Sequence, residues 1–315
     1  MMQDAGLIAL DWGTSSLRAW LLDDDGTVRA ARSEGWGIMH LPEGGYPTAY
    51  AAITEGWHDR ARPAIACGMV GSRQGWVEAP YLPTPAGLAE LAGSLVQVET
   101  GLGTLRLVPG LLEAGDPAFP DVMRGEETQA VGAMRRLGGD AILVLPGTHS
   151  KWARLAGHRL TGFETLMTGE VYALLSKHSI LGRGVADAPE GSAELRDAAF
   201  ARGVLAAQDR GALARLFSSR ALMLTGAIEP SAVLDYLSGL LIGEELRLAS
   251  PILQAGDPRV ALTGDGRLCA RYERAFEIAG YAAPERVDNS ALQGLVDIAG
   301  AAGLIVPTQL QPSGA

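Results

Sequence analysis

The stretch LIALDWGTSSLRAW, residues 7–20, decides the expected fold. An apolar run, Leu7–Leu10, leads into a single aspartate, Asp11, and then into a Gly-Thr-Ser-Ser turn. A second apolar run, Leu17–Leu22, follows the turn, so the pattern predicts two buried strands joined by a hairpin. A turn rich in glycine and hydroxyl side chains offers backbone N–H groups and hydroxyls to an anion. Asp11, at the end of the first strand, would face the same place.

The same layout appears again near the middle of the chain. The sequence AILVLPGTHSKWARLAG, residues 141–157, also has the pattern of a strand, a Gly-Thr turn and a second strand. Gly147 and Thr148 take the places of Gly13 and Thr14. A motif that opens both halves of a chain is typical of an internally duplicated fold. We therefore expect two domains of similar construction.

Composition and charge set the class of protein. The chain has 315 residues, of which 47% are hydrophobic and 20% charged, which is enough for two domains with cores of their own. Its net charge is −10 and no cluster of Lys and Arg stands out, so nucleic acid is not an expected partner. The two cysteines are far apart, and no signal peptide or membrane-spanning pattern is present, so we expect a cytoplasmic protein.

The Gly-Thr turns have two interpretations. A single hairpin of this kind is most simply an ordinary turn with a solvated aspartate. The repetition of the turn, with Lys151 beside the second copy, favours phosphate binding instead. It is not a Walker loop, because GxxxxGK[ST] is missing and a strand follows the turn where a helix would be required. In the phosphate interpretation Asp11 holds Mg²⁺ through water, since magnesium commonly uses one or two carboxylates together with substrate phosphates.

The helix expected after Gly125 begins with two glutamates, Glu126 and Glu127. Glu127 starts the apolar face that continues with Val131 and Met134. A carboxylate directed inward at a helix start is a candidate base for an attacking hydroxyl. The alternative is a structural role, because the free N–H groups and the dipole of a helix start favour acidic residues. Helices are also expected over residues 168–178, 193–216, 233–248 and 270–280, and from residue 289 onward.

Eight segments together resemble the actin, sugar kinase and Hsp70 superfamily and, within it, the 2-dehydro-3-deoxygalactonokinases. They are DWGTSSLRAWL, GMVGSRQGWVEAPYLPTPAG, VPGL, VMRGEETQ, LPGTHSKW, MTGEVYALL, YLSGLLIGEE and ARYERAF, and they span nearly the whole chain. The resemblance implies an α/β fold of two ribonuclease-H-like domains. Each would have a mixed five-stranded sheet with flanking helices, and ATP would lie in the cleft between them. The domains would cover residues 1–123 and 124–288, with a helix at about 289–305 that packs back on the first.

The resemblance also implies roles for individual residues. Asp11 would be catalytic as the Mg²⁺ ligand, and Glu127 would be the base, similar to a glutamate of exopolyphosphatases in the same superfamily, whereas most sugar kinases use an aspartate. The residues implied for ATP are Gly13, Thr14, Ser15, Gly147, Thr148, Lys151, Gly264, Asp265 and Gly266. The second phosphate motif of the superfamily usually begins with an aspartate, where this chain has Leu145 and Pro146. Asp11 would therefore be the only strand-end carboxylate on the metal.

The implied acceptor is a sugar acid with a carboxylate, a 2-keto group and hydroxyls. Arginine is the preferred partner of a carboxylate, so Arg124 and Arg73 are candidates, with Ser72 beside them. Trp76 would wall the sugar site together with Trp12. For each of these residues a purely structural role is the alternative, since tryptophans in particular are commonly core residues.

The expected activity is transfer of the γ-phosphoryl group of ATP to the 6-hydroxyl of 2-dehydro-3-deoxy-D-galactonate, which yields the 6-phosphate and ADP in galactonate breakdown. One alternative is a kinase for a related keto-deoxy sugar acid. Another is an exopolyphosphatase-like phosphohydrolase, in which Glu127 activates water, although the acidic sequence shows no basic groove for a long polyanion. A non-enzymatic sensor on the same fold is a third. The expected partners are ATP and the sugar acid, without nucleic acid or membrane, and a homodimer is compatible with the sequence.

Overall fold

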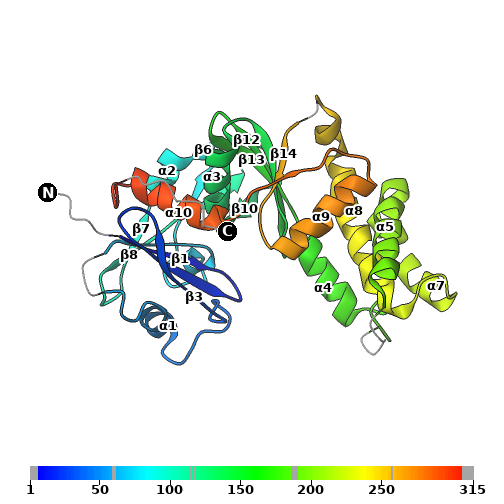
Figure 1. Ribbon diagram of the computed structural model, residues 1–315, viewed down its shortest axis with the longest axis horizontal. Helices are drawn as coiled ribbons and strands as arrows, with labels where there is room; N and C mark the ends of the chain where they lie inside the picture. Colours follow the sequence, from blue (N-terminus) through cyan, green and yellow to red (C-terminus); the bar gives the residue numbers. More distant parts are fainter. Residues whose placement is uncertain are drawn as a thin grey trace. The chain divides into compact units, whose positions relative to one another are not determined.

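The computed structural model describes residues 6–58, 62–113, 115, 118–185, 191–256 and 258–306. The chain divides into two compact units, and Figure 1 shows their helices and strands coloured along the sequence. Unit 1 consists of Met1–Asp140, Ala153–Phe163 and Val287–Ala315, and unit 2 of Ala141–Trp152 and Glu164–Arg286. Both units contain sheets and helices.

Unit 1 is built on a six-stranded sheet with the order β3-β2-β1-β4-β8-β7. These strands are β1 (Leu7–Trp12), β2 (Leu17–Leu22), β3 (Val28–Glu34), β4 (Ala64–Cys67), β7 (Val96–Glu99) and β8 (Thr104–Leu107). β1, β2 and β3 form an antiparallel meander, and β4 and β8 run parallel to β1. We expected five strands. The sixth is β7, which pairs antiparallel with β8 because a tight turn, closed by the Thr100 N to Gly103 O bond, folds it back onto the sheet edge.

The central strand β1 is buried on both faces. Ile8, Leu10 and Trp12 pack into one core cluster with residues of helix α1 (Gly45–Ile53), and helix α10 (Ser290–Ala301) contacts β1 and β4. Figure 1 shows α1 and α10 on opposite sides of this sheet. A strand covered on both faces reads as a continuous apolar run, which is why LIAL precedes the aspartate. Since side chains alternate, Asp11 lies on the face opposite to Trp12.

The rest of unit 1 leads the chain to helix α3 (Glu126–Leu137). A three-stranded sheet has the order β10-β9-β5, and its strands are β5 (Tyr81–Pro83), β9 (Gly110–Glu113) and β10 (Asp121–Met123). Along the chain the turn η1 (Met69–Gly71) precedes β5, and the short elements β6 (Ala86–Gly87) and α2 (Leu88–Ala92) follow it. α3 packs against α10, where a Cβ on Gly132 would lie 2.1 Å from the Ser290 oxygen and one on Gly294 would lie 1.9 Å from the Thr128 oxygen. This backbone contact places α3 in unit 1, whereas we expected residues 124–140 to open the second domain.

Unit 2 repeats the strand order of unit 1. The sequence β13-β12-β11-β14-β15 corresponds to β3-β2-β1-β4-β8. The strands are β11 (Ala141–Leu145), β12 (Ser150–Ala156), β13 (Arg159–Leu166), β14 (Val260–Leu262) and β15 (Glu285–Arg286), with β14 parallel to both β11 and β15. The tip of the β12–β13 hairpin, Ala153–Phe163, belongs to unit 1, where β13 pairs with β6. The shared order agrees with a duplicated fold.

The helices of unit 2 pack closely because glycines face each other. They are α4 (Thr168–His178), α5 (Ala193–Arg210), α6 (Ala212–Arg215), α7 (Ser218–Leu224), α8 (Val233–Gln254) and α9 (Gly266–Ile278), with the 3-10 turn η2 (Pro230–Ala232) before α8. A Cβ on Gly203 of α5 would lie 2.2 Å from the Tyr236 oxygen, and one on Gly239 of α8 would lie 2.1 Å from the Phe200 oxygen. The two helix backbones are therefore in direct contact, side by side in Figure 1.

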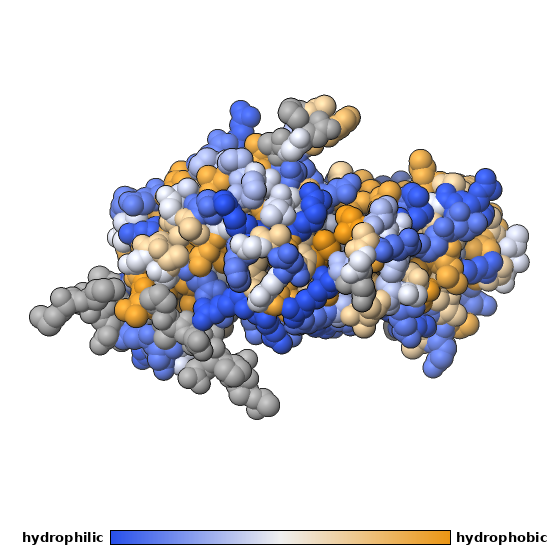
Figure 2. Space-filling view, turned by 90° about the horizontal axis from the view of Figure 1, so that it is seen from above, coloured by the Kyte–Doolittle hydropathy of each residue, from blue (hydrophilic) through white to orange (hydrophobic). Residues whose placement is uncertain are grey.

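The surface shows a mixture of residue types. Figure 2 shows hydrophobic residues scattered among hydrophilic ones over one face of the molecule. Exposed apolar side chains of this kind are common on folded proteins and need no ligand to explain them. Among the helices of the described residues, none combines the length and hydropathy that a bilayer crossing requires.

Candidate active site

The first predicted phosphate turn connects β1 to β2 in unit 1. The Gly13 N–H donates to the Ser16 oxygen at 2.9 Å, which closes the turn. The following segment packs against it, because Ile38 N donates to the Gly13 oxygen at 3.1 Å and Met39 N to the Thr14 oxygen at 3.2 Å. Thr14 and Ser15 are nevertheless exposed. The turn is thus fixed by its backbone and leaves two hydroxyl side chains accessible.

Asp11 lies beside this turn and is paired with Arg18. The Arg18 Nη2 atom lies 3.2 Å from Asp11 Oδ2, and the two residues are opposite each other in the β1–β2 register. The side chain of Asp11 is 14% exposed and that of Arg18 is 55% exposed. Burial raises the pKa of Asp11, and the Arg18 charge opposes that rise. We did not predict Arg18 as a site residue, although the hairpin register would have placed it there.

A second carboxylate, Glu127, lies near the same strand ends. The Cys67 Sγ atom is 4.0 Å from Asp11 Oδ1. Burial is the main cause that raises the pKa of the Cys67 thiol, and the charges of Asp11 and Glu127 raise it further. Both carboxylates therefore lie close to the thiol. Two glycines allow this approach: a Cβ on Gly68 would lie 2.7 Å from the Trp12 oxygen, and one on Gly125 would lie 3.1 Å from Gly68 Cα. The ends of β1 and β4 and the start of α3 therefore meet.

Glu127 is 1% exposed, and its own helix start holds it. Oε2 accepts from Gly125 N at 2.6 Å and Oε1 from the Thr128 hydroxyl at 3.0 Å. Burial raises the pKa of Glu127 to about 8, with a smaller contribution from the charge of neighbouring Glu126. Glu126 is only half buried, and its Oε2 accepts from Arg124 N at 3.0 Å. Glu127 thus caps its own helix start, and its role as a base stays a prediction.

Arg124 is buried in unit 1 with donors that are not used. Its Nη2 atom donates to the Ala79 oxygen at 2.8 Å, and its guanidinium lies 4.3 Å from the centre of the Tyr81 ring. The residue is 8% exposed, yet Nε and Nη1 have no hydrogen-bond partner among the described residues. The buried hydroxyl of Ser72 also has no hydrogen-bond partner among the described residues. Because unsatisfied buried donors are costly, this arrangement suits an anionic ligand.

The other predicted substrate residues follow Ser72 in the same loop. Arg73 is exposed. Trp76 is half buried and stacks on Tyr46, with ring centroids 5.9 Å apart and an interplanar angle of 13°. Trp12 is fully buried and donates to the Trp36 oxygen at 2.8 Å, so it is a core residue and does not wall a site. The pair of Trp76 and Tyr46 is the partly open aromatic surface of this region.

In unit 2 the second predicted phosphate turn, with Gly147 and Thr148, connects β11 to β12. The start of α4 packs on it: Glu170 N donates to the Thr148 oxygen at 2.9 Å, and a Cβ on Gly169 would lie 2.4 Å from the Gly147 oxygen. Thr148 is exposed and accessible to a ligand. Lys151 is 4% exposed and therefore lies within the protein, next to the turn in sequence.

The predicted adenosine motif lies beside the second phosphate turn. Gly264 has a φ of 143°, and a Cβ there would lie 3.3 Å from the Pro146 oxygen, so the two turns are neighbours. Asp265 is the N-cap of α9 and accepts from Arg267 N and Leu268 N, both at 3.0 Å and both through Oδ1. Gly266 begins the helix. Capping of α9 is a structural role for Asp265 that needs no ligand. We did not predict this role from the sequence.

A cavity of about 200 Å³ opens next to these turns in unit 2. Its wall includes Gly147, Gly169 and Tyr172 from the turn and α4, Leu241 from α8, and Leu268 and Tyr272 from α9. A largely apolar pocket with a few polar groups at its edge, beside a Gly-Thr turn, suits a nucleoside attached to phosphates. The sequence did not point to the contributions of α4 and α8, because the spacing that makes them helices does not show which of their faces meet.

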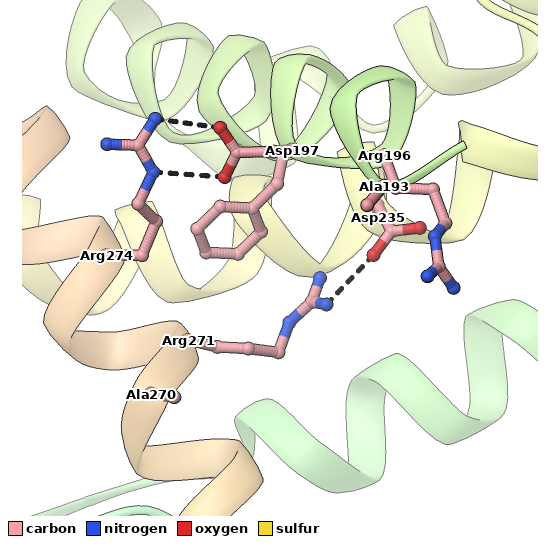
Figure 3. A pocket seen from close by; sticks show the side chains of 8 residues that line it. Ala193, Arg196, Asp197, Asp235, Ala270, Arg271 and Arg274 are labelled. Carbon is pink, nitrogen blue, oxygen red and sulfur yellow. Dashed lines mark hydrogen bonds and ion pairs between the residues drawn. The ribbon is translucent and has the colours of Figure 1, made fainter. Parts of the chain in front are cut away.

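A second cavity of unit 2, about 320 Å³ in volume, lies among α5, α8 and α9 (Figure 3). Two arginines and two aspartates of its wall form ion pairs. Arg274 binds Asp197 through two hydrogen bonds of 3.0 and 2.8 Å, and Arg271 binds Asp235 at 2.8 Å. The Arg271 guanidinium also lies 4.6 Å from the centre of the Phe200 ring. These contacts join three helices, and Arg271 is a wall residue of both cavities.

Metal-binding groups are sparse. Within the described ranges, the structure holds no group of three or more His, Cys, Asp or Glu side chains that could bind a metal ion. Asp11 beside the first turn is a single carboxylate. That donor set fits Mg²⁺, which dehydrates reluctantly and is usually held by one or two carboxylates, substrate phosphates and water.

Comparisons with known proteins agree with these features. The sequence model of the 2-keto-3-deoxy-galactonokinase family matches residues 11–298. The chain is 42% identical over 280 residues to the probable 2-dehydro-3-deoxygalactonokinase DgoK1 of Rhizobium meliloti, covering 86% of this chain and 89% of that protein. It is 36% identical over 276 residues to the 2-dehydro-3-deoxygalactonokinase of Escherichia coli, covering 88% and 91%.

A solved structure extends the agreement to three dimensions. The crystal structure of a candidate 2-dehydro-3-deoxygalactonokinase from Sinorhizobium meliloti superimposes with a TM-score of 0.83 at 39% identity, covering 94% of this chain and 98% of that one. Together with the shared strand order of the two sheets, this confirms the expected fold class of two ribonuclease-H-like units. The chain therefore belongs to the 2-keto-3-deoxy-galactonokinase family.

Proposed function

We propose that this chain transfers the γ-phosphoryl group of ATP to the 6-hydroxyl of 2-dehydro-3-deoxy-D-galactonate, giving 2-dehydro-3-deoxy-6-phosphogalactonate and ADP. The relatives described above are named for this sugar acid. The observation that carries the proposal for this chain is Arg124, whose buried guanidinium has two nitrogen atoms without partners in the described part of the chain. A carboxylate is the natural complement of that group, and a sugar acid brings one.

The surroundings of Arg124 support a fixed carboxylate site. The Ala79 oxygen and the Tyr81 ring hold the guanidinium in place. Its Nη1 atom lies beside Gly71, since a Cβ on that glycine would be 3.2 Å away, and Ser72 with its unpartnered hydroxyl follows directly. We assign Nη1 and the Ser72 hydroxyl to the substrate carboxylate. Arg73 and Trp76, in the same loop, are assigned to the remainder of the sugar acid.

Glu127 is assigned as the base for the acceptor hydroxyl. Phosphoryl transfer needs a group that accepts the hydroxyl proton as the new O–P bond forms. The pKa of Glu127, raised to about 8, makes its carboxylate a stronger base than an ordinary glutamate. Glu126, half buried beside it, is the alternative, and comparison of Glu127→Gln with Glu126→Gln decides between them.

ATP is assigned to the two Gly-Thr turns and the cavity of unit 2. Gly13, Thr14 and Ser15 offer an accessible turn in unit 1. In unit 2 the proposed residues are Gly147, Thr148, Lys151, Gly264, Asp265 and Gly266, and the 200 Å³ cavity would take the nucleoside. Asp11 would hold Mg²⁺, and when bound the ion neutralises charge on the phosphates. Arg18, which pairs with Asp11, stays close enough to help balance that charge.

The proposal is tested by a coupled assay of ADP formation with ATP, Mg²⁺ and a panel of keto-deoxy sugar acids. We expect 2-dehydro-3-deoxy-D-galactonate to give the highest kcat/KM. Because Arg124 is assigned to the sugar acid and not to ATP, Arg124→Met should raise the KM of the sugar acid by about 100-fold and change the KM of ATP by less than about twofold. Arg29→Met, which removes an exposed arginine paired with Asp23, is the matched control.

Three results would contradict the proposal. The first is ADP formation no higher than background with every sugar acid. The second is a kcat/KM that is higher for another keto-deoxy acid, which would make the chain a related sugar-acid kinase. The third is release of inorganic phosphate from ATP or polyphosphate at the same rate with and without sugar acid, which would make it a phosphohydrolase.

A further inference from the structure

Glu245, in α8 of unit 2, is a buried carboxylate that has no part in the chemistry proposed above. It is 1% exposed. Its Oε2 atom accepts from the Ser150 hydroxyl at 3.0 Å and from Trp152 Nε1 at 2.8 Å, and its Oε1 atom accepts from the Tyr272 hydroxyl at 2.6 Å. The Thr168 side chain contributes a fourth hydrogen bond. One carboxylate thus binds side chains from β12, α4 and α9.

The hydrogen bonds of the Glu245 carboxylate indicate more than a packing role. All four donors are neutral side chains, and burial raises the pKa of Glu245 while the four hydrogen bonds oppose that rise. Burying a carboxylate is costly even when it is well hydrogen-bonded, and an apolar side chain of similar size often gives equal or greater stability. Unlike an apolar side chain, the carboxylate of Glu245 fixes the orientation of four hydrogen-bond donors at once.

Three of those donors belong to the elements that surround the nucleotide cavity. Ser150 is the second residue after Thr148 of the phosphate turn. Thr168 begins α4, and the next residue, Gly169, packs against the Gly147 oxygen of the same turn. Thr168 and Tyr272 also line the cavity directly. The carboxylate therefore connects the end of the turn, the start of α4 and the side of α9.

We propose that Glu245 is a positioning residue for the nucleotide, which holds the Gly147–Thr148 turn, the start of α4 and Tyr272 in the geometry that the nucleotide requires. It acts through Ser150, Thr168 and Tyr272. The inference rests on the proposed function only for the identity of the ligand. The carboxylate itself lies beneath the cavity wall and is not one of its lining residues.

The test measures Mg·ADP binding to the full-length chain by titration calorimetry, so that it does not depend on the sugar acid. Glu245→Gln keeps the shape but replaces one acceptor oxygen with a donor group. We expect it to weaken Mg·ADP binding and raise the KM of ATP by about tenfold or more, since small displacements of a binding group have effects of this size. The KM of the sugar acid should stay within about twofold.

Two further variants separate positioning from stability. Ser150→Ala removes the donor nearest the turn and should weaken Mg·ADP binding, whereas Trp152→Phe removes a donor to the same oxygen further along β12 and should weaken it less. Glu244→Gln is the matched control: Glu244 precedes Glu245 in α8 but pairs with Arg247 and the Ala212 N–H, and its change should leave binding unaltered.

The outcomes are distinct. If Glu245→Gln, or Ser150→Ala where the glutamine variant does not fold, binds Mg·ADP within about twofold of the parent and only melts at a lower temperature, Glu245 is a stability residue and the inference is wrong. If the parent chain binds Mg·ADP but phosphorylates no sugar acid, the proposed function fails while the calorimetric comparison still decides the inference.

Discussion

Replacement of Glu127 by glutamine should separate the stability of unit 1 from its activity. The carboxyl has a pKa of about 8 in the folded chain, against an ordinary value of 4.5 for glutamate. An acid whose folded pKa is raised opposes folding as the pH increases, because the unfolded chain then releases the proton more readily. The free energy of unfolding is therefore unaffected below the pKa of the unfolded chain, and it falls progressively as the pH rises to the pKa of the folded chain. Glutamine does not ionise, so it removes this loss.

The magnitude follows from the linkage between protons and folding. One pKa unit corresponds to about 1.4 kcal/mol, so the raised pKa of Glu127 lowers the free energy of unfolding of the parent by about 3 kcal/mol at pH 7. The amide oxygen of glutamine can still accept one hydrogen bond, while loss of the second costs about 1 kcal/mol. We expect Glu127→Gln to be more stable than the parent at neutral pH by roughly 2 kcal/mol, and the difference to grow until about pH 8.

The assay is urea denaturation of the parent and of Glu127→Gln at several values between about pH 5 and pH 9, with kinase activity measured in parallel. The variant should lose kcat by about 100-fold or more, because the base is gone. Glu78→Gln, at an exposed glutamate of unit 1, is the control and should change neither quantity. Parallel stability curves for parent and Glu127→Gln would refute the raised pKa, and activity within about tenfold of the parent would transfer the role of base to Glu126.

Two further predictions concern glycines at close backbone contacts. Gly294→Ala places a Cβ 1.9 Å from the Thr128 oxygen, so it should separate α3 from α10 and lower the free energy of unfolding by more than about 2 kcal/mol, which urea denaturation measures. Gly139→Ala, where a Cβ would meet no described atom within 4 Å, is the control and should have less than half that effect. Gly169→Ala places a Cβ 2.4 Å from the Gly147 oxygen, so it should displace the second phosphate turn and raise the KM of ATP by about tenfold, with little change in the KM of the sugar acid. An unchanged stability in the first case, or equal changes in both KM values in the second, would contradict the packing described.

The sequence predicted the local elements well where the pattern itself contains the information. Alternation and turn chemistry located β1 and β2, and the helix expected over residues 168–178 is α4. The helix expected over 193–216 is divided, because Gly211 has a φ of 79° and ends α5 before α6 begins. The predicted start of α9 was four residues late, because we overlooked the capping role of Asp265.

What the sequence could not supply was contact between distant segments. The place of α3 in unit 1 depends on two glycines, Gly132 and Gly294, that approach residues far away in the chain. For the candidate site, residue type and motif were enough to single out Arg124, but only the fold shows that its guanidinium is buried with unused donors. The role of Glu245 could not be predicted from the sequence, because it depends on hydrogen bonds with four side chains from three other elements.

The most direct test of the account is to identify where the γ-phosphoryl group of ATP goes. Isotope-labelled ATP is incubated with the full-length chain, Mg²⁺ and 2-dehydro-3-deoxy-D-galactonate, and the products are separated by mass. The account predicts label on the sugar acid, at its terminal hydroxyl, in amounts equal to the ADP formed. Label found only in inorganic phosphate, with the sugar acid unchanged, would contradict it.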